Sequence, residues 1–235
     1  MNARATFPPG DGGRLIAYGR DIVTKTPALM AAYVRVGMSC DACHLDAGRK
    51  AHGGSLLGVY AKFPQWNDRS HRFIALQDRL AECFLYSMNG RPPAYNSREM
   101  IALVAYIAFL SRGAKVGRGF PDQDLIAVKS TSPPNAAKGR SLYQTRCSSC
   151  HAPDGAGQGT FPPLWGPKSF NDGAGMHRLG TMAAFVRYNM PYGAPPNTLS
   201  AQEAYDVSAF VLSHARPAFV ATRAIRFPAE PAKDF

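Results

Sequence analysis

The sequence lacks an apolar run long enough to cross a membrane. Its longest strongly apolar stretch, Ile101 to Leu110, has about half of the ~20 residues that a spanning helix needs. Met1 to Gly13 also lacks the charged start and the apolar stretch of a secretory signal. We therefore expect no membrane span.

Acidic residues are scarce as well, with 16 Asp and Glu against 27 Lys and Arg, for a formal net charge of +11. Such an excess can indicate a protein that binds nucleic acid or a membrane surface. No block of five basic residues occurs, so we expect no nucleic-acid partner. Dispersed basic faces instead favour small anions or an acidic redox protein as partners.

Cysteines are few, and their spacing carries most of the information. Four of the five form two CxxC pairs, each followed directly by His. The C-x-x-C-H run is the signature of covalent c-type haem attachment, with the His as an axial ligand. Two thiols three residues apart lie on one helical turn, so both can form thioethers with the haem vinyl groups. The two motifs are Cys40, Cys43, His44 and Cys147, Cys150, His151.

The alternatives to haem are disulfides or zinc held by the CxxC pairs. The adjacent His in both copies favours two covalent haems. Because haem of this kind is attached outside the cytoplasm, we expect a periplasmic protein whose leader peptide has been removed.

A length of 235 residues suits two domains, and the two motifs sit at similar places in the two halves, as in a tandem duplication. Glycines and prolines interrupt the pattern between Ser111 and Asn135. We predict an all-α fold of two tandem class I cytochrome c-like domains. The predicted boundaries are 1–120 for the first domain, 121–135 for a linker, 136–216 for the second domain and 217–235 for a C-terminal arm.

Each domain is expected to have a first and a last helix that cross. The predicted helices are Arg14 to Thr26 and Arg98 to Leu110 in the first domain, and Ala136 to Tyr143 and Ala201 to Ser213 in the second. A cap at Asn96 or Ser97 and a capping box from Ser200 to Glu203 mark two of the starts. We expect Gly139 to face Tyr205 where the helices of the second domain cross.

The two halves differ between the haem motif and the last helix. The span from Pro153 to Pro196 is expected to be poor in regular structure. The first half has an additional element from about Ser70 to Met88, and we expect function to lie there.

The second axial ligand decides the chemistry of each haem. In the second domain the candidates are Met176, Met182, Met190, His177 and His214. Met190 is favoured because a proline and a glycine hold its loop, whereas methionines elsewhere commonly fill gaps in a core.

In the first domain the candidates are Cys83 and Met88. A lone cysteine in an apolar stretch is usually an inert, buried side chain. Here Arg79 and Ser87 stand four residues before and after Cys83, so a helix places the three on one face. A neighbouring cation favours the thiolate, and a ferric iron would favour it further.

Several segments together resemble the dihaem thiosulfate dehydrogenases. They are residues 79–92 (RLAECFLYSMNGRP), 39–48 (SCDACHLDAG), 63–66 (FPQW), the region from Asn96 to Ser111, and 189–191 (NMP). The segment from Cys83 to Gly90 is the specific part, since CxxCH is shared by cytochromes of every kind.

The resemblance implies that two thiosulfate ions couple into tetrathionate at a haem ligated by His44 and Cys83, with tetrathionate reduction as the reverse reaction. Two arginines, Arg69 and Arg79, would hold the anions, and Ser87 would line the same pocket. The resemblance also implies that the Cys83 sulfur leaves the iron and forms a persulfide-type adduct.

The resemblance further implies that a second haem, ligated by His151 and Met190, passes electrons to a small periplasmic redox protein, either a cytochrome c or a high-potential iron–sulfur protein. Some members have a lysine before that methionine that can exchange as ligand; Asn189 stands here, so no exchange is expected.

Two other functions stay open. One is an enzyme for another sulfur anion, such as a subunit that joins thiosulfate to the cysteine of a carrier protein. The other is a pure dihaem electron carrier, in which Met88 is the ligand and Cys83 is structural.

Overall fold

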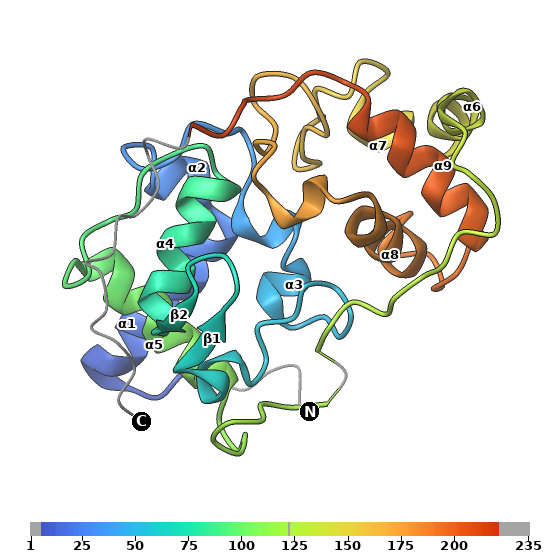
Figure 1. The fold of residues 1–235 in the computed structure, drawn as a ribbon. Coiled ribbons are helices and arrows are strands. Elements are labelled where there is room, and N and C mark those ends of the chain that lie inside the picture. Colours follow the sequence, from blue (N-terminus) through green and yellow to red (C-terminus); the bar gives the residue numbers. More distant parts are fainter. Residues whose placement is uncertain (1–5, 122, 221–235) are drawn as a thin grey trace.

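The computed structural model describes residues 6–121 and 123–220, which form two groups of helices joined by long loops (Figure 1). The first group contains α1 (Gly10–Thr24), α2 (Thr26–Leu29), η1 (Cys40–Ala42), α3 (Leu45–Gly48), η2 (Val59–Lys62), β1 (Gln65–Asn67), β2 (Arg72–Ile74), α4 (Leu76–Tyr86) and α5 (Arg98–Leu110). The second contains α6 (Ala136–Arg146), α7 (Ser148–His151), η3 (Gly175–His177), α8 (Leu179–Asn189) and α9 (Ala201–Leu212).

In the first group, α1 packs against α5 with Gly19 at the crossing. A Cβ at Gly19 would lie 2.0 Å from the carbonyl oxygen of Ala102 and 2.8 Å from Cβ of Tyr106. The two backbones therefore approach more closely than any side chain at position 19 allows. Ile22 and Leu103 are buried in the same core.

The second group repeats this crossing with α6 and α9. A Cβ at Gly139 would lie 2.0 Å from the carbonyl oxygen of Asp206 and 2.9 Å from Cβ of Phe210. The expectation that Gly139 faces Tyr205 at this crossing is therefore wrong. The Tyr205 hydroxyl instead donates to the carbonyl of Val128 at 2.8 Å, which ties α9 to the segment before α6.

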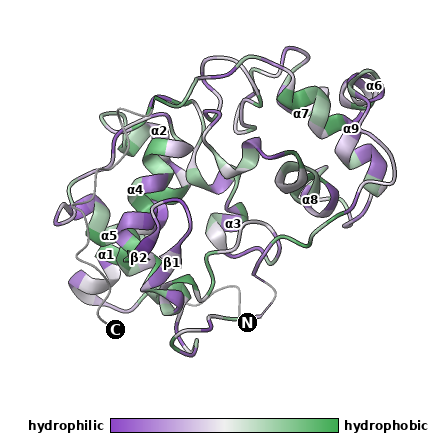
Figure 2. Ribbon diagram, in the orientation of Figure 1, coloured by the Kyte–Doolittle hydropathy of each residue, from purple (hydrophilic) through white to green (hydrophobic). Residues whose placement is uncertain are grey.

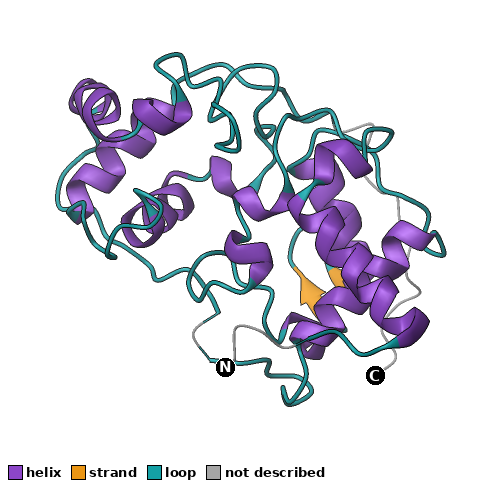
Figure 3. Cartoon of the chain, turned by 180° about the vertical axis from the view of Figure 1, so that it is seen from behind, coloured by secondary structure: helices purple, strands orange, loops and turns teal. Residues whose placement is uncertain are grey.

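The element that distinguishes the first group is a β-hairpin followed by α4. β1 and β2 pair antiparallel, with Trp66 opposite Phe73. The hairpin is the small orange element in Figure 3, where loops in teal make up much of the remaining chain. Figure 2 shows green and purple stretches on α4, which buries apolar side chains such as Phe84 together with the acidic Asp78 and Glu82.

Helix positions agree with the sequence for α5 and differ elsewhere. α1 begins at Gly10 rather than Arg14, and α6 continues to Arg146 rather than Tyr143. The expectation of little regular structure from Pro153 to Pro196 is wrong for Leu179–Asn189, which forms α8. Arg178, at the N-cap of α8, makes no side-chain cap bond, so no local signal marks the start of this helix.

The predicted domain boundaries stay a prediction. Of the predicted arm, 217–235, the part from residue 221 onward lies outside the described residues. None of the helices in 6–121 and 123–220 is long and apolar enough to cross a membrane.

Candidate functional site

The first CxxCH motif begins on η1 with Cys40 and ends at His44, immediately before α3. His44 Nδ1 is 2.5 Å from the carbonyl oxygen of Gly54. A carbonyl can only accept, so Nδ1 carries the proton and Nε2 is left bare, as in histidines that ligate metals. Burial lowers the pKa of His44, which favours the neutral imidazole that a metal requires.

The second motif has the same arrangement. His151 Nδ1 is 2.9 Å from the carbonyl oxygen of Pro162, and burial lowers the pKa of His151 as well. Each imidazole is thus held in the tautomer that presents Nε2 to a metal.

No disulfide joins the four motif cysteines, as the disulfide alternative would require. Burial raises the pKa of Cys40 and Cys43 to about 12 and that of Cys147 to about 11. Neutral, half-buried thiols beside a metal-ready imidazole fit covalent attachment of haem at both sites.

The hairpin and α4 bring Cys83 to the first motif. α4 starts where the N–H of Ala75 donates to Asp78 Oδ2 at 2.9 Å. Cys83 lies close enough for its charge to contribute to the raised pKa of both Cys40 and Cys43. The structure therefore joins two sequence signals that are separated by about 40 residues.

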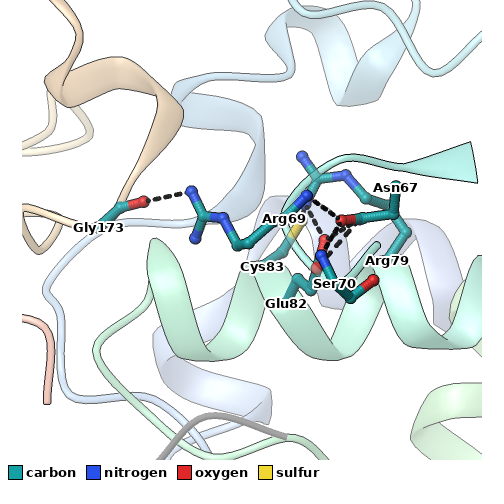
Figure 4. Close-up of polar contacts among 7 residues, drawn as sticks. All are labelled: Asn67, Arg69, Ser70, Arg79, Glu82, Cys83 and Gly173. Atoms are coloured by element: carbon teal, nitrogen blue, oxygen red, sulfur yellow. Dashed lines mark hydrogen bonds and ion pairs between the residues drawn. The ribbon is translucent and has the colours of Figure 1, made fainter. Parts of the chain in front are cut away.

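Arg79 is the cation of this site. Its Nη1 lies 3.6 Å from Cys83 Sγ and 3.4 Å from Glu82 Oε2 (Figure 4). Cys83 and Glu82 raise the pKa of Arg79, and Arg79 in turn contributes to the lowered pKa of His44. The Arg79 side chain is 47% exposed, so a permanent positive charge stands beside the thiol and within reach of solvent.

Glu82 and Asn67 belong to the site, although sequence reasoning missed them. Asn67 Nδ2 donates to both carboxylate oxygens of Glu82 at 3.1 Å. Asn67 Oδ1 accepts from the backbone N–H groups of Arg69 and Ser70 at 2.9 and 3.0 Å. The hairpin turn thereby holds Glu82, and Glu82 holds Arg79. The spacing of three residues between Arg79 and Glu82 was the available signal.

Arg69 is not brought to Cys83. Its guanidinium stacks over the ring of Tyr86 at 3.8 Å, and Nη2 donates to the carbonyl of Gly173 at 3.3 Å. Figure 4 shows this side chain extended toward Gly173 and away from Cys83. In this structure Arg69 connects α4 to the second group of helices.

Ser87 and Met88 follow α4 directly. Ser87 is the C-cap, one turn after Cys83, and its carbonyl accepts from the N–H of Asn171. Met88 is 4% exposed and packs in the hydrophobic core. Of the two candidate ligands, Met88 behaves as a core residue, and Cys83 is the one beside a cation.

In the second group, Met190 follows the last residue of α8 and is half-buried, whereas Met182 is buried in the core and Met176 packs against it. His214 stacks on Trp165 with ring centroids 4.0 Å apart, and its Nδ1 contacts the carbonyl of Phe210. Met190 is therefore the methionine on a loop outside the core.

Comparison with known proteins agrees with this geometry. Residues 31–116 match the family "SoxA/TsdA, cytochrome c domain", and residues 136–215 match the family "Cytochrome c". The thiosulfate dehydrogenase of Allochromatium vinosum is 40% identical over 227 residues, covering 92% of this chain and 84% of the relative. That of Stutzerimonas stutzeri is 41% identical over 217 residues, covering 90% and 70%.

The chain belongs to the thiosulfate dehydrogenase family. The solved thiosulfate dehydrogenase TsdBA from Marichromatium purpuratum superposes with a TM-score of 0.83 at 33% identity, covering 91% of this chain and 48% of that one. The chain thus spans about half the length of that solved protein.

Membership in the thiosulfate dehydrogenase family confirms the resemblance and the fold class expected from the sequence. The chain is an oxidoreductase with two cytochrome c domains, which carry two covalent c-type haems.

Proposed function

We propose that this chain oxidises two thiosulfate ions to one tetrathionate ion in its first domain and passes the electrons out through its second. The observation that carries the proposal is the contact of Arg79 Nη1 with Cys83 Sγ, 3.6 Å apart, beside the motif that contains His44. A thiol next to a permanent cation can act on an anionic sulfur substrate.

Cys40 and Cys43 would hold the haem of the first domain covalently, with His44 and Cys83 as its ligands. Cys147 and Cys150 would hold that of the second, with His151 and Met190 as its ligands. When bound, each haem supplies a one-electron acceptor. The bonds from His44 and His151 to backbone carbonyls support the two histidine assignments.

Cys83 is the nucleophile of the reaction. Its thiolate forms an S–S bond with the terminal sulfur of the first thiosulfate, and two electrons leave one at a time. A second thiosulfate then attacks that terminal sulfur, so tetrathionate departs and the Cys83 thiolate is restored. The second step is an exchange of the thiol–disulfide type, in which the second thiosulfate is the nucleophile and the Cys83 thiolate is the leaving group.

Arg79 makes the approach of two dianions possible. Charges of like sign a few ångströms apart repel strongly wherever water is excluded, so a cation must offset them. The planar guanidinium can donate two parallel hydrogen bonds to the oxygens of an anion. Ser87, the C-cap of α4, stands four residues after Cys83 and would line the same pocket. Arg69 would join the anion site only after leaving Tyr86 and Gly173.

The proposed location is the periplasm, and the proposed acceptor is a small redox protein with acidic character. The net charge of +11 supports attraction to such a partner. A cytochrome c and a high-potential iron–sulfur protein both suit the role.

A product assay tests the function. Protein loaded with two haems is given thiosulfate and ferricyanide, and tetrathionate is quantified. We expect one tetrathionate for every two ferricyanide ions reduced. Tetrathionate that forms poorly unless a carrier protein with a free cysteine is added would favour a thiosulfate-joining enzyme. No reaction with thiosulfate at all would favour a pure electron carrier.

Ligand assignment in the first domain has its own matched pair of variants. Cys83→Ala should change the spectrum of the first haem, because the thiolate is lost. Met88→Leu preserves apolar bulk in the core and should leave the spectrum as in the wild type. The reverse pattern would show that Met88 is the ligand and that Cys83 is structural.

A further inference from the structure

The loop that contains Met190 is attached to the first domain on both of its sides. Asn189, the last residue of α8, is 4% exposed, and its Nδ2 donates to the carbonyl of His52 at 2.9 Å. The hydroxyl of Tyr192 donates to Asp46 Oδ1. Met190 therefore lies between two residues that are each bonded to the first domain.

The segment that receives these bonds also supports His44. Asp46 comes two residues after His44, and the carbonyl of Gly54 accepts from His44 Nδ1. His52 and Gly54 are two residues apart, so a short piece of backbone holds His44 on one side and Asn189 on the other. The same backbone segment therefore supports both His44 of the first haem site and the loop of Met190 at the second.

The fit between Asn189 and this segment is close. A Cβ at Gly53 would lie 3.1 Å from Asn189 Oδ1, so a side chain there would crowd the amide. Asn189 Nδ2 also donates to the carbonyl of Phe185 within α8 at 3.0 Å. The buried amide therefore fastens the end of α8 to its own helix and to the first domain at once.

We propose that the first domain positions Met190 at the second haem, with Asn189 as the principal positioning residue and Tyr192 as a second tie. The proposal rests on the proposed ligation by Met190. A residue at the end of a helix, followed by a loop, can hold an axial thioether firmly only if the loop is fixed elsewhere. Here the fixed points are His52 and Asp46, in the other domain.

The test measures how readily Met190 leaves the iron. Ferric protein is titrated with imidazole, and loss of the near-infrared band of methionine-ligated ferric haem is followed, since this band reports only on the second haem. Asn189→Leu keeps the side-chain volume and removes the donor. We expect its apparent affinity for imidazole to be up to about tenfold higher than that of the wild type, the effect of one buried hydrogen bond. The potential of the second haem should fall as well.

Arg187→Ala is the matched control on the same helix. Its Nε bonds Asn197 Oδ1 at 3.0 Å, within the second domain, so this variant should titrate as the wild type does. Tyr192→Phe removes one hydroxyl at an exposed residue and should raise the affinity about two- to threefold. It carries the test if Asn189→Leu does not fold.

The outcomes separate the two proposals. A folded Asn189→Leu and a Tyr192→Phe that both titrate like Arg187→Ala would overturn the positioning role while leaving the ligation by Met190 intact. Absence of the near-infrared band in the unsubstituted protein would overturn the ligation and, with it, this inference. A raised affinity in Tyr192→Phe, with or without a rise in Asn189→Leu, supports the cross-domain positioning of Met190. A rise in Asn189→Leu alone would assign the effect to the lost bond to Phe185 within α8 and would count against the cross-domain role.

Discussion

The two domains share the same crossing of a first and a last helix and differ in the element that lies between the haem motif and the last helix. Gly19 and Gly139 permit the same close helix crossing, each 2.0 Å from a carbonyl oxygen if a Cβ were added. In both, a buried tyrosine hydroxyl donates to a backbone carbonyl near the haem motif: Tyr106 to Ala47 at 2.8 Å and Tyr143 to Ala152 at 2.5 Å.

The difference lies in the element that supplies the proposed second ligand. In the first domain this element is α4, where the Arg79 guanidinium contacts both the Cys83 thiol and the Glu82 carboxylate. In the second it is the loop after α8, which begins with Met190. A thioether carries no charge and offers no nucleophile, whereas a thiolate beside Arg79 offers both. Under the proposed function, the shared scaffold serves haem attachment, and the added element decides between catalysis and electron transfer.

The largest expected effect comes from the thiol that distinguishes the first domain from the second. Cys83→Ala removes the proposed nucleophile and should lower the rate of tetrathionate formation by at least about a thousandfold, the scale of loss when a nucleophile is removed. The assay is thiosulfate oxidation with ferricyanide. The methionine band of the second haem should persist, which controls for folding. Turnover close to that of the wild type would contradict the assignment of catalysis to the first domain.

Removal of the cation comes next. Arg79→Gln should lower kcat/KM for thiosulfate about a hundredfold, because hydrogen bonds between charged groups contribute up to about 3 kcal/mol. Arg140→Gln, an exposed arginine of the second domain, is the control for general charge and should be neutral. Steady-state kinetics at constant ionic strength measure kcat/KM for both variants. Equal losses in both variants would indicate long-range attraction in place of direct contact.

The shared scaffold is tested by a pair of glycine variants. Gly19→Ala and Gly139→Ala should each lower the free energy of unfolding by about 2–3 kcal/mol, because the added Cβ forces the crossing helices apart. Calorimetry measures both. Gly12→Ala, in α1 with no atom within 4 Å of its would-be Cβ, and Gly180→Ala, in α8, should not be destabilising. A neutral Gly139→Ala would show that the two crossings are not equivalent.

The smallest effect sharpens the description of the anion site. Arg69→Gln should lower kcat/KM by less than about tenfold, because its guanidinium is held by Tyr86 and Gly173 away from Cys83. The measurement is the same kinetic assay as for Arg79→Gln. A loss as large as that of Arg79→Gln would show that Arg69 turns toward Cys83 when substrate binds.

Local features of the fold could be predicted from the sequence. The capping box was confirmed, with Ser200 N–H donating to Glu203 Oε2 at 2.8 Å and Glu203 N–H donating to Ser200 Oγ at 3.2 Å. Ser97 was confirmed as the cap of α5 by its bond from Met100 N–H at 3.2 Å. These features involve residues three apart, so the chain needs no distant partner to form them.

The sequence by itself determined the two haem motifs and the shared face of Arg79 and Cys83, because each depends on spacing within one segment. It also determined the family, because the segments that carry the resemblance can be identified without knowing how they pack. Only the tertiary structure decided that Asn67 holds Glu82, that Arg69 turns toward Gly173 and that Asn189 reaches His52 across 137 positions of sequence. Polar side chains have many possible partners along a chain, and the packing of the two domains selects one of them.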